Sequence, residues 1–503
     1  MTPSRDLYDL VHSLAGAEKR YVRRTALLSG RETSWLRLFD AIDAQKEFDE
    51  EDLRRRLSGD AMLGNLSVAK RYAYYAVLRA LRAYGTGRDF DSEMGEMIEE
   101  YKVLAHKGLH DQAARLMREI KRKALAGDAY MRYLWTVIAE FGTGVHSTEN
   151  AAMDHLEATI DEQQWVLSRI ANYSFFGNIY FRQRIILRHR PTARSAEEME
   201  QLRRIVAPLI EMREEDLLTR TSWGFHHLTL GDYWEAVGQP EQARAHYDRF
   251  LEPEHLELEI GATDSLHLAE FTAALFFRLR HRMTDGLEPS IEALGNRVGK
   301  LDRRRRAFTT QIWFYERWIV TSLMLRSVTG RIEEAVELLR REGERIDELM
   351  PMMSKKMRLQ LLHTIAGVRL AQGDHGAAIE ALNMVLNDGE ASTDEYGVAM
   401  LLALVAHVEA GNTDWLDAAI RSTTRHLTSH QRYHETEKAM IAGLRSVLRA
   451  HDEKGRRAAY LRLHEKLRKL FTDPRERTVS SAIDLLAWSK AHAEGKGFGR
   501  NAV

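Results

Sequence analysis

The chain has 503 residues, of which 44% are apolar and 29% are charged, so it can bury a large core and is not expected to be disordered. Its 73 Lys and Arg balance 74 Asp and Glu, which gives no overall attraction to nucleic acid or to an anionic membrane. The absence of cysteine excludes disulfides, thiolate metal sites and cysteine nucleophiles, and it fits a reducing compartment.

No part of the sequence predicts a membrane span or a secretory signal. The longest clean apolar stretch, residues 397–406, is about half of the length that a span requires. The first six residues lack the basic and then apolar pattern of a signal peptide. We therefore expect a cytoplasmic protein that does not enter the membrane.

The pattern along the chain is helical throughout. Only eight prolines are present, and none lies between Pro3 and Pro191, which permits long uninterrupted helices. Apolar residues recur at spacings of three and four, as in Leu78, Leu81 and Tyr84, and no segment alternates like a strand. Ser195 with Glu198, and Ser392 with Glu395, have the spacing of a helix capping box. The predicted fold class is all-α.

Residues 1–86 are predicted to form an N-terminal helical cap, with helices near 35–44, 49–57 and 67–84. The same helices could form a helix-turn-helix that offers four cations of the third helix to a DNA groove. The turn before that helix looks longer than usual, and 15 Lys and Arg against 12 Asp and Glu are only mildly basic, so the cap is the favoured interpretation. The candidate nucleic-acid contacts are Lys70, Arg71, Arg79 and Arg82.

A pattern of glycine followed five residues later by alanine recurs beyond residue 86. Glycine can end one helix in a left-handed conformation, and alanine lets the next helix pack closely against it. The pairs are Gly108 with Ala113, Gly238 with Ala243, Gly330 with Ala335 and Gly373 with Ala378. A further unit is expected over Gly411 to Ala418. These positions resemble the tetratricopeptide superfamily, which implies a right-handed α-solenoid of helical hairpins with a partner-binding face.

The predicted repeat is longer than the standard tetratricopeptide unit. Ala335 and Ala378 lie 43 residues apart, whereas the standard repeat is about 34 residues. We therefore expect a tetratricopeptide-like solenoid over residues 87–493, followed by a flexible glycine-rich tail over 494–503. The N-terminal segments 6–11, 13–21, 38–43 and 48–50 also resemble the opening of a family of uncharacterised bacterial repeat proteins, and the similarity extends to residues 415–416 and 437–448. This resemblance implies a fold and no activity.

Five arginines gather around the end of a predicted helix that closes before Pro191. They are Arg182, Arg184, Arg188, Arg190 and Arg194. Such a group could bind a phosphate or an acidic peptide from a partner. Cations at the end of a helix also complement its dipole, and this structural interpretation is favoured.

No metal, cofactor or catalytic site is predicted. His426, His430 and His434 have helical spacing, but a break is expected at residues 428–429, so a metal site there is disfavoured. His226 and His227 are neighbours on one predicted helix, and adjacent residues point apart, so one is expected to be packed and the other exposed. Nucleotide-binding, hydrolase and metalloprotease motifs are absent from the sequence.

These observations predict a scaffold that binds an unidentified protein or peptide on a solenoid face and has no catalytic activity. The alternative is a transcriptional regulator, with N-terminal helices on DNA and a solenoid that senses a ligand. The balanced charge disfavours the alternative, and the potential helix-turn-helix supports it. The sequence does not indicate an oligomeric state.

Overall fold

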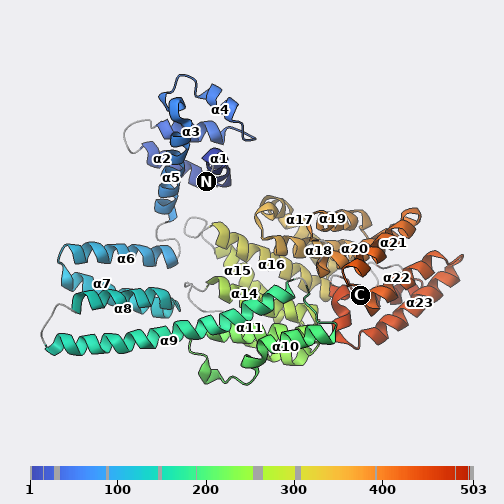
Figure 1. The fold of residues 1–503 in the computed structure, drawn as a ribbon. Helices are drawn as coiled ribbons and strands as arrows, with labels where there is room; N and C mark the ends of the chain where they lie inside the picture. The colour runs from blue at the N-terminus through green and yellow to red at the C-terminus, as the bar shows by residue number, and fades with distance from the viewer. Residues whose placement is uncertain are drawn as a thin grey trace. The chain divides into compact units, whose positions relative to one another are not determined.

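The computed structural model describes residues 3–14, 16–27, 34–85, 90–144, 150–188, 190–252, 264–300, 308–390, 393–481, 483–496 and 498. All regular structure in these residues is helical, with 23 α-helices and no strand, which confirms the all-α prediction. Figure 1 shows the helices in chain order. The described residues divide into two compact units, one of those up to residue 116 and one of those from residue 117 onward.

The first unit has its own core, built by amphipathic helices that each bury one face. Leu38 and Phe39 of α3, Leu53 of α4 and Val77 of α5 are completely buried in it. The predicted helices of this region are present, and the 3₁₀ turn η1 separates α4 from α5. The helices are α1 (Pro3–Ser13), α2 (Gly16–Leu27), α3 (Ser34–Asp43), α4 (Glu50–Arg56), η1 (Ala61–Asn65), α5 (Leu66–Gly85) and α6 (Phe90–His106).

The second unit contains most of the chain, and α7 (His110–Ala126) crosses the boundary between the units. Its first half has α8 (Tyr130–Gly144), α9 (Asn150–Leu187), α10 (Ala196–Ile210), η2 (Glu214–Asp216), α11 (Arg220–Ala236), α12 (Pro240–Tyr247), η3 (Asp248–Leu251), α14 (Asp264–Arg280) and α15 (Leu287–Lys300). Its second half has α16 (Phe308–Val328), α17 (Ile332–Leu349), η4 (Met350–Met352), α18 (Lys355–Gln372), α19 (His375–Asp388), α20 (Asp394–Glu409), α21 (Thr413–Ser429), α22 (Glu435–Leu448), α23 (Glu453–Leu470), η5 (Pro474–Ser481) and α24 (Leu485–Ala493).

Some helices of the second unit are enclosed by their neighbours, and others bury one face only. In α11 every residue from Gly224 to Gly231 is buried, and α20 buries nine of its 16 residues, all between Gly397 and Ala406. In α17 the buried residues follow the helical spacing of Ile332, Ala335, Leu338 and Leu339. A helix that is apolar on all sides is stable only inside the packing, so these inner helices bring residues from distant parts of the sequence together.

The predicted turn glycines have the expected backbone conformation. Gly108, Gly238, Gly330, Gly373 and Gly411 all have φ between 73° and 87°. The alanines that follow the first four are buried, but the last unit differs from the prediction. Ala418 is exposed and Ala419 is buried, because the buried face of α21 runs through Leu416 and Ile420. The glycine turns between consecutive helices are therefore as predicted, and in one unit the buried alanine is shifted by one residue.

The two predicted helix caps have different outcomes. Ser195 and Glu198 form the reciprocal capping box at the start of α10. Ser392 lies outside the described residues, and the residue that caps α20 is Thr393, whose hydroxyl accepts a hydrogen bond from the Tyr396 amide. Glu395 lies in the first turn of α20.

Candidate functional site

Two lysines begin α18, where the helix already carries partial positive charge. Lys355 and Lys356 occupy its first two positions, and its first turn contains no acidic residue. Ser354 caps the helix by accepting a hydrogen bond from the Met357 amide, and the Ser354 amide donates to the buried carboxylate of Glu316. The aligned peptide dipoles and the free amides of a first turn attract anions, so two ammonium groups there increase an existing positive potential.

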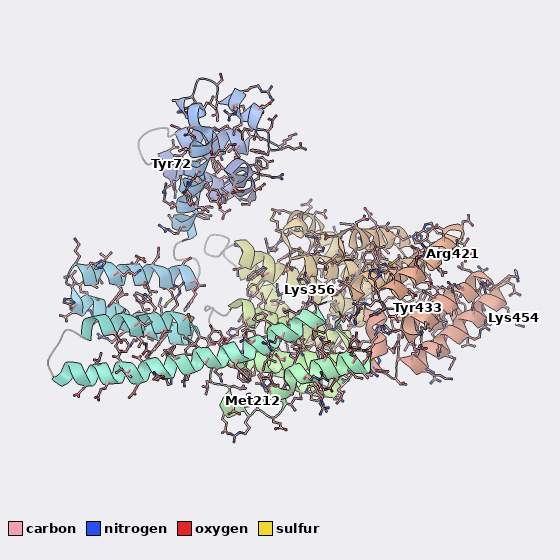
Figure 2. All side chains as sticks on the ribbon, viewed as in Figure 1. Tyr72, Met212, Lys356, Arg421, Tyr433 and Lys454 are labelled. Atoms are coloured by element: carbon pink, nitrogen blue, oxygen red, sulfur yellow. The ribbon has the colours of Figure 1, made fainter. Side chains whose placement is uncertain are left out.

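Lys356 is surrounded by charged side chains from four other helices of the second unit. Arg184 of α9, Asp232 of α11, Arg280 of α14 and Glu395 of α20 all lie close enough to act on its charge. Figure 2 labels Lys356 where the green helices meet the tan ones. These residues span positions 184 to 395, so only the packing of the inner helices brings them together. We call this arrangement the Lys356 recess.

The side chain of Lys356 is exposed to solvent and is also partly desolvated. Burial among the surrounding helices, followed by the positive charge of Arg184, lowers the pKa of Lys356 to about 8. Both properties hold for a side chain that water reaches while charged groups of neighbouring helices lie near its ammonium group. Among the described residues, Lys356 makes no hydrogen bond and no ion pair.

The two arginines of the Lys356 recess are held by carboxylates of α11. Arg184 lies 3.3 Å from Asp232, and the Tyr247 hydroxyl donates to the same carboxylate at 2.6 Å. Arg280 donates to Glu235 through both Nε and Nη2, at 2.8 to 3.0 Å. Burial alone would raise the pKa of Glu235, but Arg280 and His281 lower it to about 2. The paired groups are fixed in place, and Lys356 is left as a cation that can take a further partner.

The five sequence-predicted arginines are mostly paired within the chain. Arg184 pairs with Asp232, Arg188 with Glu390 at 3.6 Å, Arg190 with Glu198 at 2.6 Å and Arg194 with Glu437 at 2.8 Å. Arg182 is exposed and has no ion pair within the described part of the chain. Four of the five charges are thus neutralised by carboxylates, and the group does not form one common anion site.

The ion pair between Arg194 and Glu437 is buried and joins segments 243 residues apart. The two side chains are only 8% and 7% exposed. Arg432 pairs with Asp394 in the same region. Burial raises the pKa of Asp394 to about 6 and also raises that of Glu437, although neighbouring arginines oppose both shifts. The Arg194 pair connects the segment before α10 to α22, and the Arg432 pair connects the segment before α22 to α20.

A small pocket of about 220 Å³ lies beside this region. Its lining residues include Ile186, Arg190, Glu198 and Leu202. Its two charged lining residues, Arg190 and Glu198, pair with each other. Because the pocket offers no unpaired charge, it is a weaker candidate for binding than the Lys356 recess.

The four predicted nucleic-acid contacts of α5 do not share one environment. Lys70 is only 3% exposed, and its ammonium group pairs with Glu50 at 2.6 Å and lies over the Phe48 ring. Lys70 therefore holds α5 against α4 and does not face solvent. The other three residues, Arg71, Arg79 and Arg82, are exposed. Tyr72, labelled in Figure 2, lies beside Arg79 on the same helix, with the guanidinium 5.8 Å from the ring centre.

The histidine predictions are partly corrected. His226 and His227 are both buried, at 6% and 5% exposed, because α11 is enclosed on all sides. The prediction that one of them would be exposed is wrong. The rings of His426 and His430 stack at 4.3 Å, while His434 precedes α22 and lies on another element. The expected break at residues 428–429 matches the end of α21 at Ser429.

Comparison with known proteins gives no relative of this chain: no family model, no curated protein and no solved structure matches it. Across the described residues, none of the helices is both long enough and apolar enough to cross a membrane. The site must therefore be interpreted from its own residues. Sequence reasoning missed Lys356, and the one local signal was the pair of lysines at a helix start that lacks an acidic residue.

Proposed function

We propose that the protein is an interaction scaffold that binds an acidic segment of a partner protein at the Lys356 recess and has no catalytic activity. The observation that carries this proposal is Lys356 itself, an exposed cation that has no partner among the described residues and is surrounded by charged side chains of four other helices. In this proposal the helix pairs stack as a right-handed, tetratricopeptide-like solenoid, with the first helices as a cap, in a cytoplasmic protein.

The chemistry of the Lys356 recess suits a carboxylate. With a pKa of about 8, Lys356 is mostly protonated at neutral pH, and a bound carboxylate would favour its charged form. The start of α18 adds its dipole. Arg184 and Arg280 are held in place by their ion pairs with Asp232 and Glu235. The net charge around Lys356 is limited by three carboxylates, those of Asp232, Glu235 and Glu395. The recess is therefore expected to prefer a ligand with one acidic group positioned at Lys356 over a uniformly charged polymer.

The repeat-like turns support the scaffold part of the proposal. Four glycines with positive φ are each followed, five residues later, by a buried alanine. Stacked hairpins of this kind give extended preformed surfaces, and a preformed surface binds a peptide with little ordering cost in the scaffold. An acidic helix or an extended acidic segment would therefore be the expected ligand.

The test is a binding measurement with a matched pair of charge reversals. A fluorescein-labelled, glutamate-rich peptide is titrated with the full chain at low salt, and fluorescence anisotropy reports binding. Lys356→Glu should weaken binding at least about tenfold, since it replaces a cation by an anion in the recess. Lys454→Glu is the control, because Lys454 is also exposed and is also the second residue of an 18-residue helix, α23.

The two substitutions separate site binding from general charge effects. The control should stay within about twofold of the unmodified chain, because it changes net charge by the same amount outside the recess. Equal losses in both variants, or no binding by the unmodified chain, would overturn the proposed site.

A transcriptional regulator is the second candidate. The observation in its favour is the exposure of Arg71, Arg79 and Arg82 on one helix, beside the exposed Tyr72. The full chain should then retard a mixed-sequence DNA duplex at low salt, and Arg71→Glu with Arg79→Glu should abolish the shift. Absence of retardation by the unmodified chain would remove this candidate.

A further inference from the structure

Three histidines of the second unit meet between α11 and α12, outside the Lys356 recess. They are His226, His227 and His246, and one ring nitrogen from each lies within 4.8 Å of the others. The closest approach is 2.9 Å, between the Nδ1 atoms of His227 and His246. We call this group the histidine cluster.

The fold brings these three rings together through the turn between two packed helices. His226 and His227 are adjacent on the enclosed helix α11, and the turn at Gly238 reverses the chain so that His246 of α12 returns to them. The helices approach closely at Gly231, where an added Cβ would lie 3.1 Å from the Tyr247 ring. The His227 ring has its centroid 5.0 Å from that of His226 and 5.2 Å from that of His246.

The hydrogen bonds of the histidine cluster are incomplete. Nδ1 of His226 and Nε2 of His227 are buried without a hydrogen-bond partner in the described structure. A buried ring nitrogen without a partner costs roughly 1–3 kcal/mol, so folded proteins seldom leave several of them together. The two Nδ1 atoms at 2.9 Å form one hydrogen bond, in which one ring donates its proton and the other accepts it.

We propose that the histidine cluster binds one divalent transition-metal ion, with Zn²⁺ as the expected occupant. Zn²⁺ binds imidazole nitrogen at about 2.0–2.1 Å, which places two ligand nitrogens about 3.4 Å apart in a tetrahedral site. The nitrogens of the cluster lie between 2.9 and 4.8 Å from one another, so small side-chain rotations reach that geometry. Three imidazoles leave the fourth position to water or to a group of the partner.

The residues in and around the histidine cluster determine which metals it suits and from which side a metal can enter. No carboxylate belongs to the ligand group found among the described residues, which disfavours Mg²⁺ and Ca²⁺ and suits Zn²⁺, Ni²⁺ or Cu²⁺. Trp223 and Phe250 pack against the His227 ring and exclude water from one side. His246 is half-buried and gives access from the surface. The nearby positive charge of Arg249 is paired with Glu214.

The experiment measures zinc binding by the full, untagged chain after dialysis against a chelator. Competition with a chromogenic zinc chelator gives the affinity, and native mass spectrometry gives the stoichiometry. We expect one Zn²⁺ per chain with a dissociation constant below about 10 μM, and at least about a tenfold loss in His246→Gln, which removes the least buried ligand. His226→Asn should lose affinity to a similar degree.

Two control variants test whether zinc binds at the histidine cluster and not at another histidine. His363→Gln removes another buried histidine, on α18, whose Nε2 also lacks a partner. His430→Gln disrupts the stacked pair at the C-terminal end of α21. Both should bind zinc within about twofold of the unmodified chain. The site would be overturned if the unmodified chain failed to bind zinc at 100 μM, a concentration about tenfold above the expected dissociation constant. Retention of zinc binding in His246→Gln would also overturn it. So would a loss in His430→Gln as large as that in His246→Gln.

A spectroscopic measurement keeps the test valid if a ligand variant folds poorly. Co²⁺ added to the unmodified chain should give visible absorption bands of a four-coordinate nitrogen site, and Zn²⁺ should remove them. Bands of six-coordinate Co²⁺ alone would contradict the site. Because the histidine cluster and the Lys356 recess share no residue, loss of zinc binding and loss of peptide binding can be distinguished.

Discussion

The arginine segment, residues 182–194, and the Lys356 recess show opposite relations between charge and binding capacity. The arginine segment has the higher density of cations in the sequence, but four of its five arginines pair with carboxylates of the same chain. The recess contributes one lysine that has no partner in the described residues. A cluster of cations in a sequence thus indicates where charge is placed, while the tertiary pairing decides which charge can receive a ligand.

The largest expected effect is on stability, at the buried pair of the arginine segment. Arg194→Met leaves the Glu437 carboxylate buried without its partner and should lower the free energy of unfolding by about 3–5 kcal/mol. Urea denaturation followed by circular dichroism measures it. Arg182→Met is the control, and it should change stability by less than about 0.5 kcal/mol, because Arg182 is exposed.

The double variant Arg194→Met with Glu437→Leu sharpens this result. It removes both charges and should recover much of the lost stability, because a pair of apolar side chains has no desolvation cost. If Arg194→Met and Arg182→Met were equally stable, the arginine segment would not have the structural role given to it here.

The second prediction concerns pH and Asp394, which lies in the same buried network. Its pKa is raised to about 6 by burial, so the folded chain holds this proton more tightly than the unfolded chain. The resulting stability is complete below the unfolded pKa near 4 and is lost as the pH rises through about 6. The difference in unfolding free energy between the unmodified chain and Asp394→Asn should therefore fall by roughly 2 kcal/mol from pH 4 to pH 7.5.

Denaturant melts at several pH values in one ionic strength would measure this difference. A difference that stays constant or increases with pH would show that Arg432 and Arg194 outweigh the burial of Asp394. In that outcome the charges of the two arginines, and not burial, would set the direction of the shift in the pKa of Asp394.

The third prediction concerns the pH dependence of binding at the Lys356 recess. Because burial and Arg184 lower the pKa of Lys356 to about 8, the affinity for an acidic peptide should fall several-fold between pH 7 and pH 9. Lys356→Arg should bind with little change over that range, since a guanidinium stays protonated. A parallel fall in both proteins would assign the pH dependence to another group.

The smallest expected effect is at the surface of the arginine segment. The side chains of Arg188 and Glu390 are 71% and 42% exposed, and their charged groups are 3.6 Å apart. Arg188→Met should change the unfolding free energy by less than about 0.5 kcal/mol, because solvent screens an exposed pair. Thermal melting of Arg188→Met and Arg194→Met measures this, and the melting temperature should fall much less in Arg188→Met. A loss close to that of Arg194→Met would mean that exposure does not set the strength of these pairs.

Local features of the sequence predicted much of the fold. The helical spacing and the rarity of proline predicted an all-α chain, and each predicted turn glycine has a positive φ. Ser195 and Glu198 form the predicted capping box because its hydrogen bonds span only three residues. The one-residue shift from Ala418 to Ala419 arose because a single small residue does not fix the buried face of a helix.

The sites were less predictable because their partners are distant in the sequence. The spacing of His226 and His227 suggested opposite exposures, but the packing around α11 buries both. Lys70 looked like a surface cation of an amphipathic helix, and Glu50 pairs with it across the helix interface. The sequence contained no signal for His246, because its approach to α11 depends on the angle between two packed helices.

By itself, the sequence determined the secondary structure of this protein and the positions of several helix turns. These depend on contacts within four residues, whose spacing is fixed by helix geometry. The tertiary structure alone decided that Arg194 faces Glu437, that Lys356 faces Arg184 and Glu395, and that His246 reaches His227. These contacts depend on how the enclosed helices pack. Packing brings together residues that are far apart in the sequence, so no local spacing predicts them.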